Sequence, residues 1–287
     1  MRVAGAPISW GVCEVPGWGY QLAPPLVLAQ MRDLGLTATE LGPVGFLPDE
    51  PAAKAEVLTS YGLEAVAEFV PVVLHDSQVD PVPVLDAALD GLVAAGAGVV
   101  VLAAATGATG YDDRPSLDDA DWRRVAATLD ALSDRAADRG VLATLHPHVG
   151  TVVESAEEID RVLTTSAVAL CLDTGHALIG GADPVALARD AADRIRHVHL
   201  KDVDLAWAAR VRAGDLPYSS AVAHGLYRPL GEGQVDISAI VAALEATGYA
   251  GWYVLEQDTV LDSEPTGPGP AADVQRCLDY LRSCSRR

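Results

Sequence analysis

The sequence predicts an α/β fold of the (β/α)8 TIM-barrel class, and three observations lead to this expectation. Eight apolar, strand-like segments alternate with helix-like segments along 287 residues, the pattern of repeated strand–helix units. Several strands end on ionisable side chains, which is where a barrel of this class carries its chemistry. The length suits one barrel, so we expect a single domain over residues 1–287 with no internal boundary.

The clearest unit runs from Val168 to Asp202. It reads VALCLDTGH, then a helix-like run from Asp183 to Arg194, then RIRHVHLKD. Asp183 followed by Pro184 is a typical helix start. A strand–helix–strand unit joins parallel strands whose two faces are both covered, which accounts for their continuous apolar runs. The polar residues that follow each run should therefore lie at the carboxyl ends of buried strands.

The other elements follow in order, bounded by ordinary start and stop signals. Glycines after several apolar-periodic segments end the predicted helices, and Ser155 with Glu158 forms a capping box for another. Strands are predicted at 2–9, 36–41, 63–73, 97–105, 141–148 and 251–258, and helices at 24–34, 51–61, 84–95, 118–138, 236–247 and up to about residue 284. Residues 203–230 interrupt the rhythm as a long insertion on the face of the polar strand ends, where long loops are often lids.

Composition excludes several classes of partner. The formal net charge of −20 argues against nucleic acid and anionic membrane surfaces, because both need a basic face. No apolar run reaches the roughly 18 residues of a membrane span, and the first residues lack the apolar core of a signal peptide. The four cysteines show no C-x-x-C spacing. We therefore expect a reduced, cytoplasmic protein; the sequence leaves open whether it forms a homo-oligomer.

Ionisable residues at the strand ends indicate a metal site. Burying an unpaired charge costs several kcal/mol, a cost usually offset by pairing or by a metal. Carboxylate and imidazole ligands together suit Mn²⁺, Co²⁺, Fe²⁺ or Zn²⁺ better than Mg²⁺. Each of these residues taken alone could instead be a hydrogen-bonded polar group at a strand end. Taken together, Asp173, His199 and Glu256 favour a metal site. The full set of such residues is Glu40, His75, His146, Asp173, His199 and Glu256.

The motifs LDTGH, HVHLKD and GWYVLEQD resemble those of the xylose-isomerase-like TIM-barrel superfamily of sugar isomerases, epimerases and dehydratases. Within it, HPHVGTVVES, RIRHVHLKD, GEGQVD and the N-terminal APISWG and ATELGP resemble the myo-inosose (2-keto-myo-inositol) dehydratases. The resemblance covers nearly the whole chain and is strongest over 141–258. It implies a metal-dependent lyase that removes water from a keto-inositol such as 2-keto-myo-inositol through a stabilised enolate, with a ketose isomerase or epimerase as the alternative.

The resemblance also implies the metal ligands. In this superfamily a Glu, an Asp, a His and a Glu from strands five to eight commonly bind one divalent ion. Asp173, His199 and Glu256 match three of these positions, and His146 stands nearest to the missing fifth-strand Glu. We therefore expect these four residues to bind the metal. Mn²⁺ or Co²⁺ is the first choice, with Zn²⁺, Fe²⁺ and Mg²⁺ as alternatives.

Two residues are candidates for proton transfer. Lys201 is one of only two lysines beside 18 arginines, and unlike arginine a buried lysine can lose its proton. It lies two residues beyond His199 on the same strand face, so proximity to a metal should lower its pKa. The alternative is a structural ion pair with Asp202. His176 follows Asp173 closely; it is either an acid or base, or a hydrogen-bonding partner of a ligand.

Three further residues are candidates for substrate binding. Glu40 would bind substrate hydroxyls unless it is merely a solvated strand end. His148 would bind substrate or metal, or else orient its loop. Trp10, with Trp18, would form an apolar wall for a ring, with core packing as the alternative. More distant functions are an apurinic endonuclease, which the acidic charge disfavours, and a sugar-binding barrel without catalysis, which the proton-transfer candidates disfavour.

Overall fold

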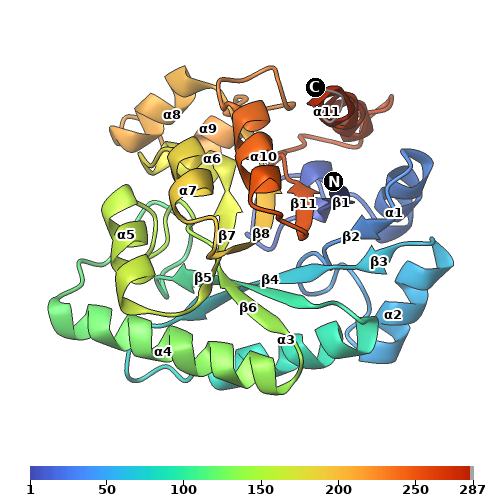
Figure 1. The fold of residues 1–287 in the computed structure, drawn as a ribbon. Coiled ribbons are helices and arrows are strands. Elements are labelled where there is room, and N and C mark those ends of the chain that lie inside the picture. The colour runs from blue at the N-terminus through green and yellow to red at the C-terminus, as the bar shows by residue number, and fades with distance from the viewer. Residues whose placement is uncertain (285–287) are drawn as a thin grey trace.

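The computed structural model of the protein describes residues 1–284, and its main sheet wraps into a barrel surrounded by helices (Figure 1). Within the described residues the sheet has nine strands in the order β3-β2-β1-β11-β8-β7-β6-β5-β4, and the paired strands run parallel. Only Val66 separates β3 from β4. The two ends of the sheet are therefore joined through the chain, and β3 with β4 makes one interrupted strand, which confirms the predicted fold class.

The strands agree with the predicted segments but are shorter. The barrel strands are β1 (Arg2–Gly5), β2 (Ala38–Thr39), β3 (Glu64–Ala65), β4 (Ala67–Val73), β5 (Val99–Ala105), β6 (Leu142–Leu145), β7 (Ala169–Asp173), β8 (Ile195–Leu200) and β11 (Trp252–Leu255). The first predicted strand ends early because Pro7 begins a 3-10 helix, η1 (Pro7–Trp10). Proline lacks the N–H that a sheet ladder requires.

Helices follow the strands and cover the outside of the barrel (Figure 1). Their limits are α1 (Pro24–Asp33), α2 (Pro51–Ser60), α3 (Val82–Ala95), α4 (Asp119–Asp138), α5 (Ala156–Thr165), α6 (Thr174–Ile179), α7 (Pro184–Asp190), α10 (Ile237–Ala246) and α11 (Pro270–Cys284). The sequence analysis missed α6. It begins directly at the end of β7, because the Asp173 carboxylate accepts hydrogen bonds from the backbone N–H groups of Gly175 and His176 and so caps the helix.

The insertion at 203–230 is ordered. It contains α8 (Leu205–Arg212), α9 (Tyr218–Ala223) and β10 (Tyr227–Arg228), which pairs antiparallel with β9 (Asp202–Val203). Asp202 anchors this region. Its two carboxylate oxygens accept hydrogen bonds from the backbone N–H groups of four residues, with N···O distances of 2.8–2.9 Å: Val203, Gly231, Gly233 and Val235. The insertion is therefore fixed to the end of β8 rather than loosely attached.

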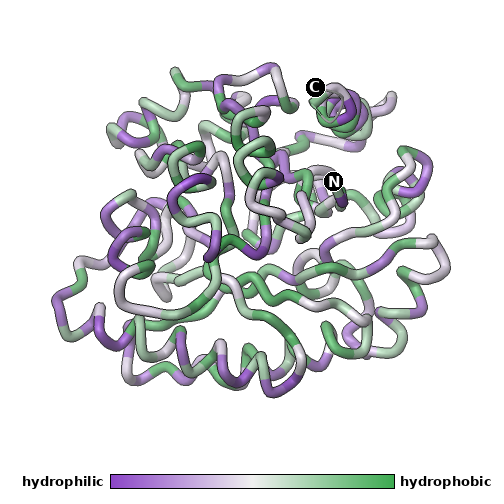
Figure 2. Tube along the Cα trace, in the orientation of Figure 1, coloured by the Kyte–Doolittle hydropathy of each residue, from purple (hydrophilic) through white to green (hydrophobic). Residues whose placement is uncertain are grey.

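The hydrophobic core has two parts. Figure 2 shows apolar stretches along the strands and polar stretches on the outward turns of the helices. The larger cluster lies between the sheet and the helices and contains most of the buried leucines and valines. A smaller cluster of mostly short side chains fills the barrel and includes Ala4, Ala38, Val101, Cys171 and Val254. Among residues 1–284, no helix combines the length and apolar character that crossing a membrane requires.

Candidate functional site

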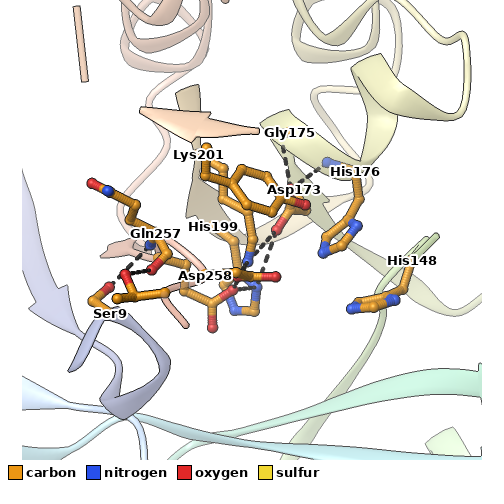
Figure 3. A network of polar contacts seen from close by, with 12 residues as sticks. Ser9, His148, Asp173, Gly175, His176, His199, Lys201, Gln257 and Asp258 are labelled. Atoms are coloured by element: carbon orange, nitrogen blue, oxygen red, sulfur yellow. Dashed lines mark hydrogen bonds and ion pairs between the residues drawn. The ribbon is translucent and has the colours of Figure 1, made fainter. Parts of the chain in front are cut away.

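The polar side chains at three neighbouring strand ends meet at one end of the barrel (Figure 3). Asp173 ends β7, Lys201 directly follows β8, and Glu256 directly follows β11. These strands are adjacent in the sheet, and their carboxyl ends open on the same side. The three side chains and His199 of β8 are buried, with at most 7% of each residue exposed. The structure thus brings together Asp173, His199 and Glu256, the three residues that the sequence jointly favoured as metal ligands.

Asp173 is shared between the helix cap and this cluster. Its Oδ1 accepts the two N–H groups that begin α6, at 2.9 and 2.7 Å. Its Oδ2 lies 3.2 Å from Nε2 of His146 and 3.7 Å from Nδ1 of His199. Burial alone raises the pKa of Asp173, but the charge of Lys201 and the neighbouring imidazoles hold it well below its ordinary value. Asp173 is therefore a fixed carboxylate with one oxygen turned toward its neighbours.

Lys201 lies among three carboxylates, which changes the expectation drawn from the sequence. Its Nζ forms ion pairs with Glu256, with Asp173 Oδ2 at 3.2 Å, and with Asp258 Oδ1 at 2.9 Å. Burial lowers the pKa of Lys201, but the charges of Asp173, Asp258 and Glu256 raise it well above its ordinary value. This direction is opposite to the lowered pKa expected for Lys201 from the sequence and favours the charged ammonium. The alternative pairing with Asp202 is also absent, because that carboxylate binds backbone amides.

Three histidines lie beside the carboxylates, with His148 and His176 stacked and His146 edge-on to both. The ring centroids of His148 and His176 lie 3.7 Å apart, and those of His146 and His148 lie 5.4 Å apart. His148 Nδ1 donates to the carbonyl of Val149 at 2.7 Å, which leaves Nε2 as the acceptor of the neutral ring. Burial lowers the pKa of His148 to about 3 and that of His176 well below its ordinary range. These rings are therefore neutral near pH 7.

A cavity of about 930 Å³, its open mouth included, adjoins the cluster. Its polar lining contains Glu40, His146, His148, Lys201, Glu256 and Asp258, and its aromatic lining contains Trp18, Phe69, Tyr111 and Tyr218. Neither His176 nor His75 is among the lining residues. A polyhydroxylated molecule bound here would meet both hydrogen-bonding groups and flat apolar faces.

Trp10 does not form the expected wall of this cavity. It is fully buried, its indole N–H donates to Oε1 of Gln30 at 2.8 Å, and it is not a lining residue. Core packing, the alternative considered for Trp10, accounts for its position. Trp18 lines the cavity instead, with its indole N–H held by the carbonyl of Thr259 at 2.9 Å.

Sequence reasoning missed three residues of the site. Asp258 is buried, contacts Lys201 and accepts a hydrogen bond from the hydroxyl of Tyr218 at 2.7 Å. Tyr218 comes from the insertion at 203–230, and Tyr111 from the Gly-rich loop after β5 packs its ring 4.8 Å from that of His148. Only Asp258 had a signal in the sequence, since it closes the motif GWYVLEQD that also contains Glu256.

The donor atoms fit a divalent metal ion. One ligand atom each of Asp173, His199 and Glu256 lies within 4.8 Å of the others. The buried Nδ1 of His199 makes no hydrogen bond, although Oε2 of Glu256 is 3.0 Å away. A buried imidazole nitrogen without a hydrogen bond, facing two carboxylates, is a mixed oxygen and nitrogen donor set of the kind that transition-metal ions bind. His146 joins Asp173 in a second such group together with His176.

The protein is similar to sugar-processing enzymes in sequence and in structure. An inosose dehydratase from Geobacillus kaustophilus is 34% identical, over 98% of this chain and 93% of that protein. The solved structure of the IolI protein with a binding zinc atom has a TM-score of 0.73 at 16% identity, covering 99% of this chain and 98% of that chain. A D-allulose 3-epimerase from Methylomonas, solved with D-allulose, has a TM-score of 0.68 at 17% identity, covering 99% and 96%.

The two structural neighbours share the fold at low identity, whereas the dehydratase is related over nearly its whole length. A family model described as the xylose isomerase-like TIM barrel matches residues 28–284. This match contains Asp173, His199, Lys201 and Glu256 and confirms the family resemblance of the motifs. The chain belongs to the xylose isomerase-like TIM-barrel family.

Proposed function

We propose that this protein is a metal-dependent lyase that removes water from a keto-inositol such as 2-keto-myo-inositol. The observation that carries the proposal is the 34% identity to an inosose dehydratase over 98% of this chain. A buried cluster of carboxylates and imidazoles beside a cavity with aromatic walls is chemically consistent with it. The negative net charge also fits a small neutral substrate better than a nucleic acid.

Asp173, His199 and Glu256 would hold the divalent ion, with His146 as a fourth ligand. Mn²⁺ or Co²⁺ is our first choice for this donor set, and the zinc in the IolI structure keeps Zn²⁺ as an alternative. A bound divalent ion supplies Lewis-acid stabilisation of the charge that develops on a ketone oxygen. The remaining requirements of the reaction are proton transfers, which fall to residues of this chain.

We infer that His148 would remove the proton next to the ketone. It lines the cavity, its Nδ1–H is held by the Val149 carbonyl, and its low pKa keeps Nε2 unprotonated. When Nε2 takes this proton, the electron pair of the C–H bond moves toward the carbonyl group. His176 stacks on His148 and is not a lining residue, so it would orient that ring rather than act on substrate.

We infer that Lys201 would assist the departing hydroxyl. Its ammonium lines the cavity and is kept charged by the surrounding carboxylates. A proton from Nζ passes to the β-hydroxyl, the C–O bond breaks, and water leaves as the electron pair forms the carbon–carbon double bond. Lys201 then regains a proton from solvent and His148 releases one, so the enzyme returns to its starting state. Asp258 holds the ammonium in place.

A ketose epimerase of the same family is the alternative, favoured by the fold shared with the D-allulose 3-epimerase. Mass spectrometry of the product separates the two functions, because dehydration yields a product lighter by one water whereas epimerisation leaves the mass unchanged. Metal-free protein should be loaded separately with Mn²⁺, Co²⁺ and Zn²⁺ and given 2-keto-myo-inositol or a panel of ketoses. Turnover of the ketoses alone, without loss of water, would contradict the proposal.

A further inference from the structure

Glu40 makes a contact across the interior of the barrel that its assignment to substrate binding does not explain. It directly follows β2, yet its Oε1 lies 2.7 Å from Nε2 of His197 and 2.9 Å from Nε2 of His199, both on β8. Two strands, β1 and β11, separate β2 from β8 in the sheet. Glu40 is 3% exposed and both imidazoles are fully buried. A carboxylate has therefore been placed between two histidines in the middle of the barrel.

The contact determines how His199 is presented. A carboxylate oxygen accepts hydrogen bonds, so each of the two imidazoles carries a hydrogen on the Nε2 that faces Glu40. For His199 this leaves Nδ1 as the nitrogen turned toward Asp173 and Glu256, at 3.7 and 3.0 Å. Glu40 therefore favours the tautomer of His199 that carries its hydrogen on Nε2.

The second histidine braces the carboxylate. His197 lies two residues before His199 on the same inward face of β8. Their ring centroids are 5.2 Å apart, and the shared acceptor is Oε1 of Glu40. The hydrogen bond from His197 thus fixes the position of Oε1 of Glu40.

We propose that Glu40 is a positioning residue for metal binding: by holding the Nε2–H of His199, it aims Nδ1 at the ion and makes that nitrogen a stronger donor. The inference rests on the proposed metal site and deepens it. Carboxylate partners of ligating histidines commonly change metal affinity or activity by about 10–100-fold when they are removed. Glu40 would then act through His199 rather than by binding substrate hydroxyls.

The test measures metal binding without turnover. Co²⁺ is titrated into metal-free wild-type protein and into Glu40→Gln, and the dissociation constant is obtained by calorimetry and from the absorption bands of bound Co²⁺. We expect Glu40→Gln to weaken Co²⁺ binding by about 10–100-fold and to shift the absorption bands, because the neutral amide is a poorer acceptor for the Nε2–H. Glu40→Asp, which keeps the charge but is one methylene shorter, serves as a second variant if the amide prevents folding.

Glu14→Gln is the matched control. Glu14 also lines the cavity, but its carboxylate accepts from the hydroxyl of Tyr111 and has no histidine partner among the described contacts. The Co²⁺ affinity and the absorption bands of the Glu14→Gln variant should equal those of the wild-type protein. A folded Glu40→Gln protein that binds Co²⁺ as tightly as wild type, with only KM for the substrate raised, would overturn the inference and restore the substrate-binding role. Failure of the wild-type protein to bind any divalent ion would instead refute the metal site of the proposed function.

Discussion

The ammonium of Lys201 lies 3.2 Å from Oδ2 of Asp173 (Figure 3), and the same oxygen faces the imidazoles of His146 and His199. One carboxylate oxygen on β7 thus connects the proposed proton donor to the proposed metal ligands. The charge of Lys201 and the charge of the metal would both act on Asp173. A change in Lys201 or in the metal should therefore affect the other through Asp173.

We expect Lys201→Arg and Lys201→Met both to lower kcat by on the order of 10²-fold or more, the usual scale of general acid–base catalysis. Arginine keeps the charge but does not readily release a proton, and methionine has neither charge nor proton. Steady-state kinetics at saturating metal measures the effect. Turnover close to wild type in the arginine variant would show that Lys201 supplies only charge or structure.

Removing a proposed metal ligand should abolish metal binding while the fold remains. We expect Asp173→Asn, His199→Ala and Glu256→Gln each to lose the bound divalent ion and activity, because each removes one of three converging donor atoms. Elemental analysis after gel filtration measures metal content, and circular dichroism reports the fold.

Asp202→Asn is the control for these variants. Asp202 is next to Lys201 in the chain and is also buried, but its oxygens accept hydrogen bonds from the backbone N–H groups of Gly231, Gly233 and Val235, just after the insertion. It should keep wild-type metal content even where its stability is reduced. If all three ligand variants kept metal at wild-type stoichiometry, the metal site would have to lie elsewhere.

His146 is predicted to take the ligand position that the family gives to a glutamate. Its Nε2 lies 3.2 Å from Asp173 Oδ2, and its Nδ1 has no hydrogen-bond partner. We expect a metal-bound crystal structure to show a metal–nitrogen distance to His146 of roughly 2.0–2.2 Å, and His146→Ala to bind metal more weakly than wild type. A structure in which His148 ligates in its place would refute this assignment.

Glu68 should make the protein less stable as pH rises. Burial raises the pKa of Glu68 from 4.5 to about 7 in the folded protein. The folded state therefore favours the protonated carboxyl, and this contribution is fully present below about pH 4.5 and is lost as the pH rises through 7. A shift of this size corresponds to on the order of 3 kcal/mol.

Glu68→Gln removes the titrating group, so the free energy of unfolding should fall less between pH 5 and pH 8 than it does in wild type. Urea denaturation at each pH measures the difference. Glu64→Gln is the control, because Glu64 lies nearby in the chain with an exposed side chain and should keep the wild-type dependence. Equal slopes for wild type and Glu68→Gln would contradict the predicted shift.

The sequence alone determined the barrel and the position of its site along the chain. Apolar runs that alternate with amphipathic segments specify parallel strands and covering helices, whatever their later packing. Because parallel strands share one carboxyl edge, residues such as Asp173 and Glu256 had to approach one another once the sheet closed. The capping signal Ser155–Glu158 is likewise local, and the structure shows it as a complete capping box.

Only the tertiary structure decided which side chains face each other across the barrel. Closure in the order β2-β1-β11-β8 brings Glu40 to His199, although 158 residues of chain lie between them. The same closure surrounds Lys201 with carboxylates, which reverses the pKa shift expected from a metal and burial alone. The periodicity of the sequence shows which residues share a face of a strand. It gives neither the tilt of the strand nor the residues opposite it in the barrel, so it does not give the distances on which electrostatic energies depend.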